Sequence, residues 1–203
     1  NDVPANPIAE FFSDSFNISG TKNNSGAVYT FWRDNVDGAD NWKKGTYIKA
    51  TNNDVNDYFG RSLVLDNNTL AVGAYGEDSD NSTINGLPSD INLWSTSINN
   101  SMGGSGAVYI YKHTPGELCD RCTIEGQRVP YKWSQEAYLK AYREEYTDDN
   151  RYGWDIALDK GTIYVGSPYE NSNQNTITNG DQASTDRSSG KSGAVYIYKF
   201  TGE

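Results

Sequence analysis

The sequence is poor in the side chains that carry most nucleophilic and metal chemistry. Its 203 residues contain one histidine, His113, two cysteines and one methionine. A lone imidazole next to Thr114-Pro115-Gly116 is expected to be an exposed loop residue, so a Ser–His or Cys–His catalytic pair is not predicted. Glycine-rich phosphate loops are missing, and helical patterns are nearly so. We therefore expect the protein not to be an enzyme.

Basic charge and long apolar runs are also scarce. The chain has 17 Lys and Arg against 27 Asp and Glu, which gives a formal net charge of −10 and a pI of about 4.5. Such a surface repels a phosphate backbone, so no nucleic-acid partner is expected. No uninterrupted apolar run approaches the roughly 20 residues that cross a bilayer, and residues 1–10 carry no basic and apolar leader. We expect no membrane span.

The two cysteines are separated by only two residues, in Cys119-Asp120-Arg121-Cys122. Three interpretations are open: a small disulfide loop, a redox pair and half of a zinc site. A zinc site would need carboxylate ligands, because the chain has no second cysteine pair. A redox pair needs a strand that leads into a helix, whereas both flanks have loop composition. The disulfide between Cys119 and Cys122 is favoured, and it indicates an oxidising, extracytoplasmic compartment.

What the chain has in quantity is tyrosine and glycine. Its 15 Tyr, 5 Trp and 20 Gly favour short aromatic strands that are joined by Gly- and Asn-rich turns. β-Branched and aromatic residues alternate at 107–111 and again at 194–198, as in strands. The predicted fold class is all-β.

Blocks of sequence recur in the same order along the chain. Ser-Gly-Ala-Val-Tyr occurs three times, starting at Ser25, Ser105 and Ser192, and two copies continue identically through Ile-Tyr-Lys. Three further blocks return at matching places: Tyr47-Ile48-Lys49-Ala50 as Tyr138-Leu139-Lys140-Ala141, Phe59-Gly60 as Tyr152-Gly153, and Thr69-Leu70-Ala71-Val72-Gly73 as Thr162-Ile163-Tyr164-Val165-Gly166. Self-similarity held over successive blocks indicates duplication.

Each full repeat is predicted to contain four strands. In the first repeat they lie near 46–50, 62–66, 69–74 and 106–112, and in the second near 137–141, 154–159, 162–167 and 193–199. Four antiparallel strands joined in order form a meander, and meanders repeated around an axis form a β-propeller. We expect one repeat domain in three parts: the end of a partial first blade at 1–33, a first full repeat at 34–114 and a second at 115–203. Because roughly four to eight blades close a ring, the ring is predicted to be incomplete or shared.

Three of these blocks resemble the FG-GAP repeat: Tyr58-Phe59-Gly60, Leu70-Ala71-Val72-Gly73-Ala74-Tyr75 and Ser105-Gly106-Ala107-Val108-Tyr109. The resemblance implies the β-propeller of the integrin α-subunit head, and especially its secreted bacterial relatives. By the same resemblance we expect an extracellular or cell-surface location and a role in cell adhesion. The calcium loop that integrin-type blades often carry is absent, because Asp66-Asn67-Asn68 and Asp159-Lys160-Gly161 are too short for it.

The long loops that follow Gly76 and Tyr169 begin with hard oxygen ligands at equivalent places. Calcium takes about six to eight such ligands, which alternating Asp, Asn and Ser side chains can provide. The candidate ligands are Glu77, Asp78, Asp80, Glu170, Asn171 and Asn173. The alternative is that these side chains cap turns through the local backbone. Calcium binding and turn structure both remain open.

Two tryptophans are candidates for a binding surface. Trp94 lies with other apolar residues in the loop at 75–104, where they either cover the edge of a blade or form a recognition patch. Trp133 is the second candidate. Asn81 and Asn99 begin Asn-x-Ser/Thr sequons in the same loop and are candidate glycosylation sites.

Together these features favour a non-catalytic extracellular module for adhesion or assembly that presents its loops to a protein or glycan ligand. Calcium is its candidate stabilising ion. Exposed strand edges favour self-assembly with other chains. Two alternatives stay open: a carbohydrate-binding or accessory module of a polysaccharide-degrading enzyme, with Trp94 and Trp133 lining a groove, and a purely structural subunit of a surface filament.

Overall fold

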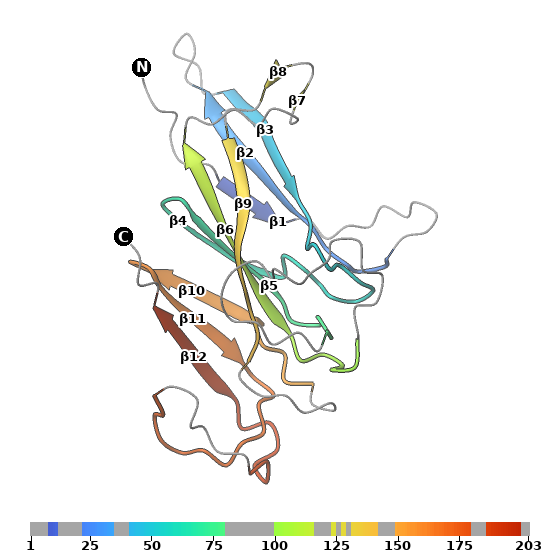
Figure 1. Ribbon diagram of the computed structural model, residues 1–203, viewed down its shortest axis with the longest axis vertical. Coiled ribbons are helices and arrows are strands. Elements are labelled where there is room, and N and C mark those ends of the chain that lie inside the picture. The colour runs from blue at the N-terminus through green and yellow to red at the C-terminus, as the bar shows by residue number, and fades with distance from the viewer. Residues whose placement is uncertain are drawn as a thin grey trace.

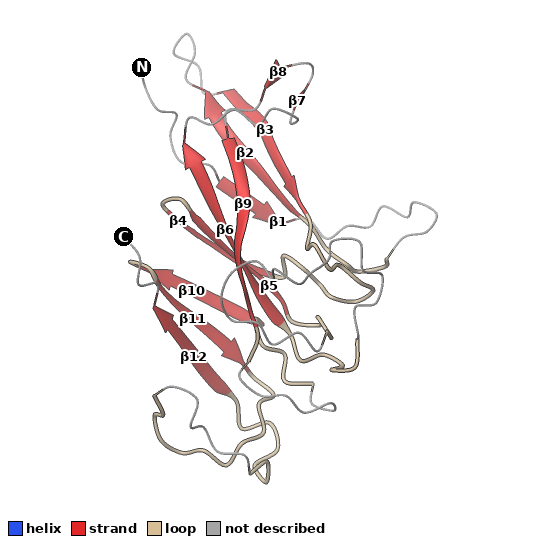
Figure 2. Cartoon of the chain, viewed as in Figure 1, coloured by secondary structure: helices blue, strands red, loops and turns tan. Residues whose placement is uncertain are grey.

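The computed structural model describes residues 8–11, 22–34, 41–79, 100–115, 123–124, 127–128, 131–141, 149–179 and 186–199. Strands and loops make up these ranges, and no helix occurs within them (Figure 2). The prediction of an all-β fold is confirmed. In the part of the chain that the structure describes, there is accordingly no helix long and apolar enough to cross a membrane.

The strands form three successive antiparallel sheets and a small ribbon (Figure 1). The first sheet has the order β1 (Ile8–Phe11), β2 (Val28–Asp34), β3 (Asn41–Ile48). The second has the order β4 (Ser62–Asp66), β5 (Thr69–Ala74), β6 (Ala107–Pro115), β9 (Tyr131–Leu139). The third has the order β10 (Asp155–Asp159), β11 (Thr162–Ser167), β12 (Ala194–Lys199), and the ribbon pairs β7 (Thr123–Ile124) with β8 (Gln127–Arg128). These are propeller-like blades built from meanders.

Tight turns connect the first two strands of the second and third sheets, as the sequence predicts. Asn67 begins the turn between β4 and β5 with a φ of 50°, and Lys160 and Gly161 form the turn between β10 and β11 with φ values of 46° and 73°. Positive φ values at such positions suit the twist of a hairpin.

The grouping of strands into sheets differs from the prediction by one strand. The strands expected near 46–50 and 137–141 were assigned to the start of each repeat, whereas β3 pairs with β2 and β9 pairs with β6. Each therefore completes the sheet of the preceding repeat, and the sheet boundaries fall after β3 and after β9. The physical reason is that an unpaired second edge of β6 would leave backbone N–H and C=O groups exposed, and β9 pairs with β6 along most of its length.

Side chains of adjacent sheets pack into two apolar layers. The layer shared by the first two sheets includes Val28, Ile48, Phe59, Val72 and Tyr109. The layer shared by the second and third includes Ala71, Val108, Ile110, Ile163 and Val165. Strand β5 is buried along its whole length because each of its faces meets one of these layers. The middle sheet is thus the interior of the structure.

Candidate functional site

The longest connections leave the sheets at a common end, which we call the loop end. In the second sheet, the start of β4 lies beside the end of β5, and the end of β5 lies beside the start of β6 (Figure 1). The start of β6 in turn lies beside the end of β9. The segments at 49–61, 75–106, 140–154 and 168–193 all depart from or arrive at this end. The candidate functional site is described at this end, where the ends of several strands meet.

A backbone clamp joins neighbouring sheets at the loop end. The Phe59 N–H donates to the Ser25 carbonyl at 3.1 Å, and the Tyr152 N–H donates to the Ser105 carbonyl at 3.1 Å. Each contact is part of an isolated parallel bridge. We name these two contacts the interblade clamps.

The repeated glycine of Ser-Gly-Ala-Val-Tyr is explained by this clamp. Gly106 has a φ of 82°, and a Cβ added to it would lie 2.1 Å from the Tyr152 carbonyl oxygen. Gly26, with a φ of 78°, would place a Cβ 2.0 Å from the Phe59 carbonyl oxygen. Both the left-handed backbone and the close approach exclude a side chain.

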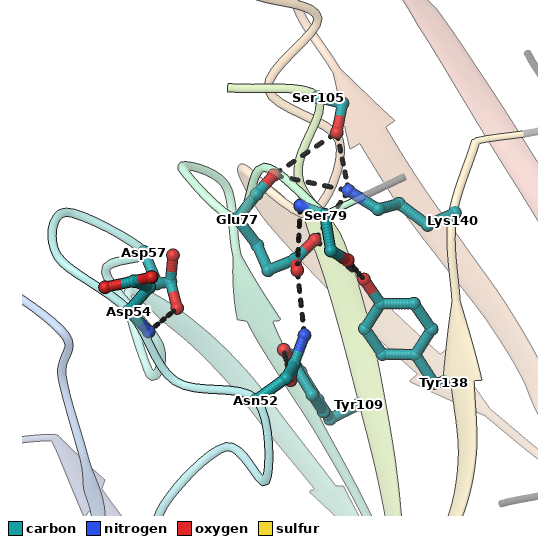
Figure 3. Close-up of polar contacts among 9 residues, drawn as sticks. All are labelled: Asn52, Asp54, Asp57, Glu77, Ser79, Ser105, Tyr109, Tyr138 and Lys140. Carbon is teal, nitrogen blue, oxygen red and sulfur yellow. Dashed lines mark hydrogen bonds and ion pairs between the residues drawn. The ribbon is translucent and has the colours of Figure 1, made fainter. Parts of the chain in front are cut away.

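Glu77 is the centre of a buried polar cluster that we call the Glu77 hub (Figure 3). Its Oε1 accepts hydrogen bonds from Asn52 Nδ2 at 2.8 Å and from the Ser79 backbone N–H at 3.2 Å. Its Oε2 accepts from the Tyr138 hydroxyl at 2.7 Å and pairs with Lys140 Nζ at 2.5 Å. The side chains of Glu77 and Lys140 are only 2% and 4% exposed, so each charge depends on the other for compensation.

Lys140 ties the hub to the start of β6. Its ammonium group also donates to Ser105 Oγ at 2.5 Å and to the Glu77 backbone carbonyl at 3.3 Å. Gly106 N–H donates to that same carbonyl at 2.8 Å. One lysine from the end of β9 therefore holds both the loop that leaves β5 and the turn that enters β6.

Two tyrosine hydroxyls complete the hub. Tyr109 donates to Asn52 Oδ1 at 2.6 Å, and the Tyr138 hydroxyl lies 2.9 Å from Ser79 Oγ. Burial, followed by the nearby charge of Glu77, raises the pKa of both phenols well above the ordinary value. Both stay neutral, and Tyr138 acts as a donor toward the carboxylate.

Parts of the hub recur in the other two sheets. In the first, Lys49 Nζ donates to Ser25 Oγ at 2.6 Å and to the Gly26 carbonyl at 2.5 Å. In the third, the Glu170 carbonyl accepts from Gly193 N–H at 2.9 Å and from Ser192 Oγ at 3.1 Å. Contacts to the Ser-Gly turn are thus repeated in all three sheets.

Negative charge accumulates beside the Glu77 hub. Asp57 is 1% exposed, and one of its oxygens accepts from the Asp54 N–H while Oδ1 has no hydrogen-bond partner. Burial raises the pKa of Asp57 to about 7, and the charges of Glu77, Asp78 and Asp54 push it in the same direction. Burial and the charges of Glu77 and Asp54 also raise the pKa of Asp78. The surroundings of Asp57 and Asp78 thus favour the binding of a proton or a cation.

The side chains of Glu77, Glu170, Asn171 and Asn173, four of the six predicted calcium ligands, have protein partners. Glu77 is saturated by the hub, and the Glu170 carboxylate accepts from the Ser172 N–H at 3.0 Å and the Ser172 hydroxyl at 2.7 Å. Asn171 Oδ1 accepts from the Lys191 N–H at 2.7 Å, and Asn173 Nδ2 donates to Asp186 at 2.8 Å. Asp78 is half-buried, and its carbonyl accepts from the Met102 N–H at 2.9 Å.

The contacts of Glu170 to Ser172 are local, as in the turn-structure alternative, whereas Glu77, Asn171 and Asn173 each bind a residue that is distant along the chain. Asp80 lies outside the described residues. Across the described ranges, no group of three or more His, Cys, Asp or Glu side chains is placed to hold a metal ion. Calcium stays a prediction at these loops.

Most of the other predicted site residues fall outside the described ranges. They are Trp94, Cys119, Cys122, Asn81 and Asn99. Trp133 is described: it is half-buried on β9, and its ring centroid lies 5.2 Å from that of His113. His113 is 6% exposed, so the expectation of an exposed loop histidine was wrong. The cause is that β6 continues through this residue and β9 covers it.

A series of stacked aromatic and cationic side chains lies at the loop end. Tyr58 stacks on Tyr75 with centroids 4.8 Å apart and an interplanar angle of 8°, and Tyr75 contacts Trp154 at 4.8 Å. The Arg151 guanidinium lies 5.4 Å from the Trp154 ring and 4.1 Å from the Tyr169 ring. Arg61 lies 5.2 Å from the Trp154 ring, and Lys191 Nζ lies 4.3 Å from the Tyr169 ring. We call these seven residues the aromatic–cation row.

Sequence reasoning missed the row and the partners of Glu77. A signal for Lys140 was present, because Tyr47-Ile48-Lys49-Ala50 and Tyr138-Leu139-Lys140-Ala141 repeat a lysine inside an otherwise apolar block. A lysine that is buried within such a block, as Lys140 is, requires an acidic partner. No comparable sequence signal marks the row, because its members come from separate loops.

A family model for the FG-GAP repeat matches residues 42–86. The match spans β3, β4, β5 and the start of the loop that leaves β5, and so it includes Phe59, Gly60 and Glu77. A comparison with curated proteins gives no significant match. The match, the internal duplication and the meander sheets agree: a segment of the chain matches the FG-GAP repeat, and it lies within propeller-like antiparallel sheets.

Proposed function

We propose that this chain is a non-catalytic extracellular binding module, and that its aromatic–cation row contacts an acidic protein or glycan ligand. FG-GAP repeats generally mediate protein interactions and are typical of extracellular or surface proteins. The single observation that carries the proposal is the row itself. In a chain with a net charge of −10, three cations and four aromatic rings are gathered at one end of the sheets.

The row has the properties of a pre-organised recognition surface. Arginine and the large aromatic side chains dominate the energy of many interfaces, because they bury much area with little loss of conformational freedom. Arg151 is fixed by hydrogen bonds to Asp149 at 3.0 and 3.1 Å and by the rings on which it lies. The interblade clamps and the Glu77 hub fix the loops beneath. Such a surface loses little entropy when it binds.

Two ligand classes compete for this surface. A glycan with carboxylate or sulfate groups would place its sugar faces on Trp154 or Tyr169 and its charges near Arg151 or Lys191. An acidic peptide would use the same cations without requiring open ring faces. The glycan reading corresponds to an accessory role in polysaccharide binding, and the peptide reading to adhesion or assembly.

Binding arrays separate the two classes. The intact protein is applied to arrays of uronic-acid and sulfated glycans and of acidic peptides. We expect binding to one class, and Trp154→Ala and Arg151→Ala each to weaken it about tenfold or more, because hot-spot truncation costs about 2 kcal/mol. The matched control is Trp42→Ala, which removes a tryptophan that is 53% exposed on β3, away from the row. Failure to bind either class, or equal loss in the control, refutes the proposal.

We also propose calcium as a stabilising ion near Asp57. The support is its unpartnered, buried Oδ1 and the raised pKa that burial and the charges of Glu77, Asp78 and Asp54 give this carboxyl, because a hard cation bound to Oδ1 would stabilise its ionised form. Calcium should raise the thermal midpoint of the wild type relative to a chelator and should raise that of Asp57→Asn less. An unchanged wild-type midpoint excludes the ion.

A further inference from the structure

The Glu77 hub holds a buried lysine and a buried asparagine on the two oxygens of one carboxylate (Figure 3). We propose that the hub is the site of a spontaneous covalent cross-link, in which Lys140 Nζ displaces the side-chain nitrogen of Asn52 as ammonia and forms an amide with Asn52 Cγ. The step occurs once in each chain and has no turnover. The inference concerns the hub and not the aromatic–cation row, so it stands or fails independently of the proposed function.

The nucleophile and the leaving group contact the same side chain. Glu77 Oε2 pairs with Lys140 Nζ at 2.5 Å, and Glu77 Oε1 accepts from Asn52 Nδ2 at 2.8 Å. To attack Cγ, the lysine has to move from Oε2 toward Asn52, and its flexible four-carbon stem permits such a move. Two groups that are held together in one folded chain react as parts of a single molecule, which gives a slow reaction a large gain in rate.

The site is shielded from water. Asn52, Glu77 and Lys140 are 5%, 2% and 4% exposed, and the rings of Tyr109 and Tyr138 beside them are buried as well. Water would solvate the ammonium group and would compete with it for the amide. A desolvated lysine next to a proton acceptor is an activated nucleophile. Burial therefore favours attack by the lysine over hydrolysis.

Glu77 supplies the proton acceptor that the lysine needs. An ammonium group has no lone pair with which to attack, so one proton has to leave Nζ first. Glu77 Oε2 lies within hydrogen-bond distance of Nζ and can take that proton as a general base. The same carboxyl group contacts Asn52 Nδ2 and can pass a proton to the leaving nitrogen.

Tyr109 polarises the amide that is attacked. Its hydroxyl is buried and donates to Asn52 Oδ1 at 2.6 Å. Negative charge develops on this oxygen when an amine adds to Cγ, and a positioned donor stabilises that charge. The amide of Asn52 is thus surrounded by a nucleophile, a general base and a donor for the developing oxyanion.

The reaction needs no oxidant, cofactor or activated group. The Nζ–Cγ bond forms and the Cγ–Nδ2 bond breaks, so one amide replaces another. Of the three protons of the lysine ammonium group, one stays on Nζ, one leaves with Nδ2 as ammonia and one remains on Glu77. No uncompensated charge is then left buried in the hub.

The cross-link would enclose the whole second sheet in a covalent loop. Asn52 lies in the connection from β3 to β4, and Lys140 follows β9, so β4, β5, β6 and β9 all lie between the two joined residues. A covalent link between distant residues restricts the unfolded chain and so stabilises the folded one. Unlike a disulfide, an amide link is not cleaved by reductants.

The test is the intact mass of the full chain, measured after denaturation so that only covalent bonds are detected. We expect the wild type, once folded, to be lighter than its sequence by one ammonia. Digestion with trypsin should then give a branched peptide that joins residues 50–61 to residues 133–143, because trypsin does not cleave after a lysine whose Nζ is in an amide. The control Lys43→Met removes an exposed lysine and should lose the same ammonia.

Lys140→Arg separates the cross-link from the ion pair. Arginine keeps a positive charge beside Glu77, but its guanidinium group is not deprotonated in proteins and is no nucleophile. The variant should fold, as followed by circular dichroism, and should keep the full mass of its sequence. Tyr109→Phe should slow formation of the bond about tenfold or more, because it removes the donor to Asn52 Oδ1. Trp154→Ala, in the aromatic–cation row, should form the bond as the wild type does.

Three outcomes overturn the proposal. The first is a folded wild type that keeps the full mass of its sequence. The second is a loss of ammonia that persists in Lys140→Arg and gives no branched peptide, because an asparagine has then cyclised onto its own backbone. The third is the loss of one water in place of one ammonia, since Lys140 would then be joined to Glu77 and not to Asn52.

Discussion

The buried pair of Glu77 and Lys140 allows a sharp test of the hub. Lys140→Met removes the ammonium group and keeps a flexible apolar stem of similar length. The Glu77 carboxylate, whose side chain is 2% exposed, then keeps only neutral hydrogen-bond donors. These donors are Asn52, Ser79 and Tyr138. The substitution also removes the donors that hold Ser105 Oγ and the Glu77 carbonyl. The folded state should be strongly destabilised.

The magnitude follows from the burial of both partners. Removing one partner of a buried ion pair costs about 3–5 kcal/mol. For a chain of this size each kcal/mol shifts Tm by about 2–4 °C, so Lys140→Met should lower Tm by about 6–20 °C. Adding Glu77→Gln removes the stranded charge, and the double variant should recover at least about 1 kcal/mol of that loss.

The assay is thermal and urea unfolding followed by circular dichroism, with all variants at the same pH and salt. Lys43→Met on β3 is the matched control, because it removes an exposed lysine and should change stability by less than about 0.5 kcal/mol. If Lys140→Met behaves like Lys43→Met, or if the double variant is no more stable than Lys140→Met, the pair is not a structural centre and the reasoning fails.

Three further predictions concern pH, the clamp glycines and the hub tyrosine. The pKa of Asp57 is about 7 in the folded state against an ordinary 3.8, so unfolding releases a proton at pH values between the two. As pH rises from 4 to 7, the free energy of unfolding of the wild type should therefore fall by up to about 4 kcal/mol relative to that of Asp57→Asn. Urea midpoints of the two proteins that change with pH in the same way would contradict this. Gly106→Ala should destabilise the fold clearly more than Gly193→Ala, because only the first substitution places a Cβ against a neighbouring carbonyl. The cost of Gly193→Ala is limited to about 1–2 kcal/mol of left-handed backbone strain. Equal unfolding midpoints of the two variants would rule out the clamp. Tyr138→Phe removes a donor from the charged carboxylate of Glu77 and should cost about 1.5–3 kcal/mol, an effect that a Tm within one degree of the wild type would exclude.

The sequence alone was sufficient for strand identity, because that information is local. Alternating residues and Asn- or Gly-containing turns determine where β4, β5, β10 and β11 lie and how each pair is connected. It was not sufficient for the assignment of β3 and β9 to sheets. A strand at a repeat boundary can pair forward or backward, and the choice depends on which edge is open and on the distant partners of its side chains.

The candidate site was partly predictable for the same reason. The repeated acidic position led to Glu77 and Glu170, but side-chain type could not distinguish a calcium ligand from the acceptor of a buried lysine. That distinction depends on Lys140, which is 63 residues away along the chain. The aromatic–cation row was not predictable, because Tyr75, Trp154 and Tyr169 become neighbours only when two sheets pack together.

The hub also shows why one repeat of this sequence does not constitute one structural unit. The segment matched as an FG-GAP repeat, 42–86, contains Asn52 and Glu77 but not Lys140, which follows β9 of the next repeat. The second sheet thus buries a carboxylate whose counter-charge lies one sequence repeat further along the chain. Because an uncompensated buried charge is strongly destabilising, this sheet depends on a strand that the sequence pattern assigns to the next repeat, and we expect the two repeats to unfold together.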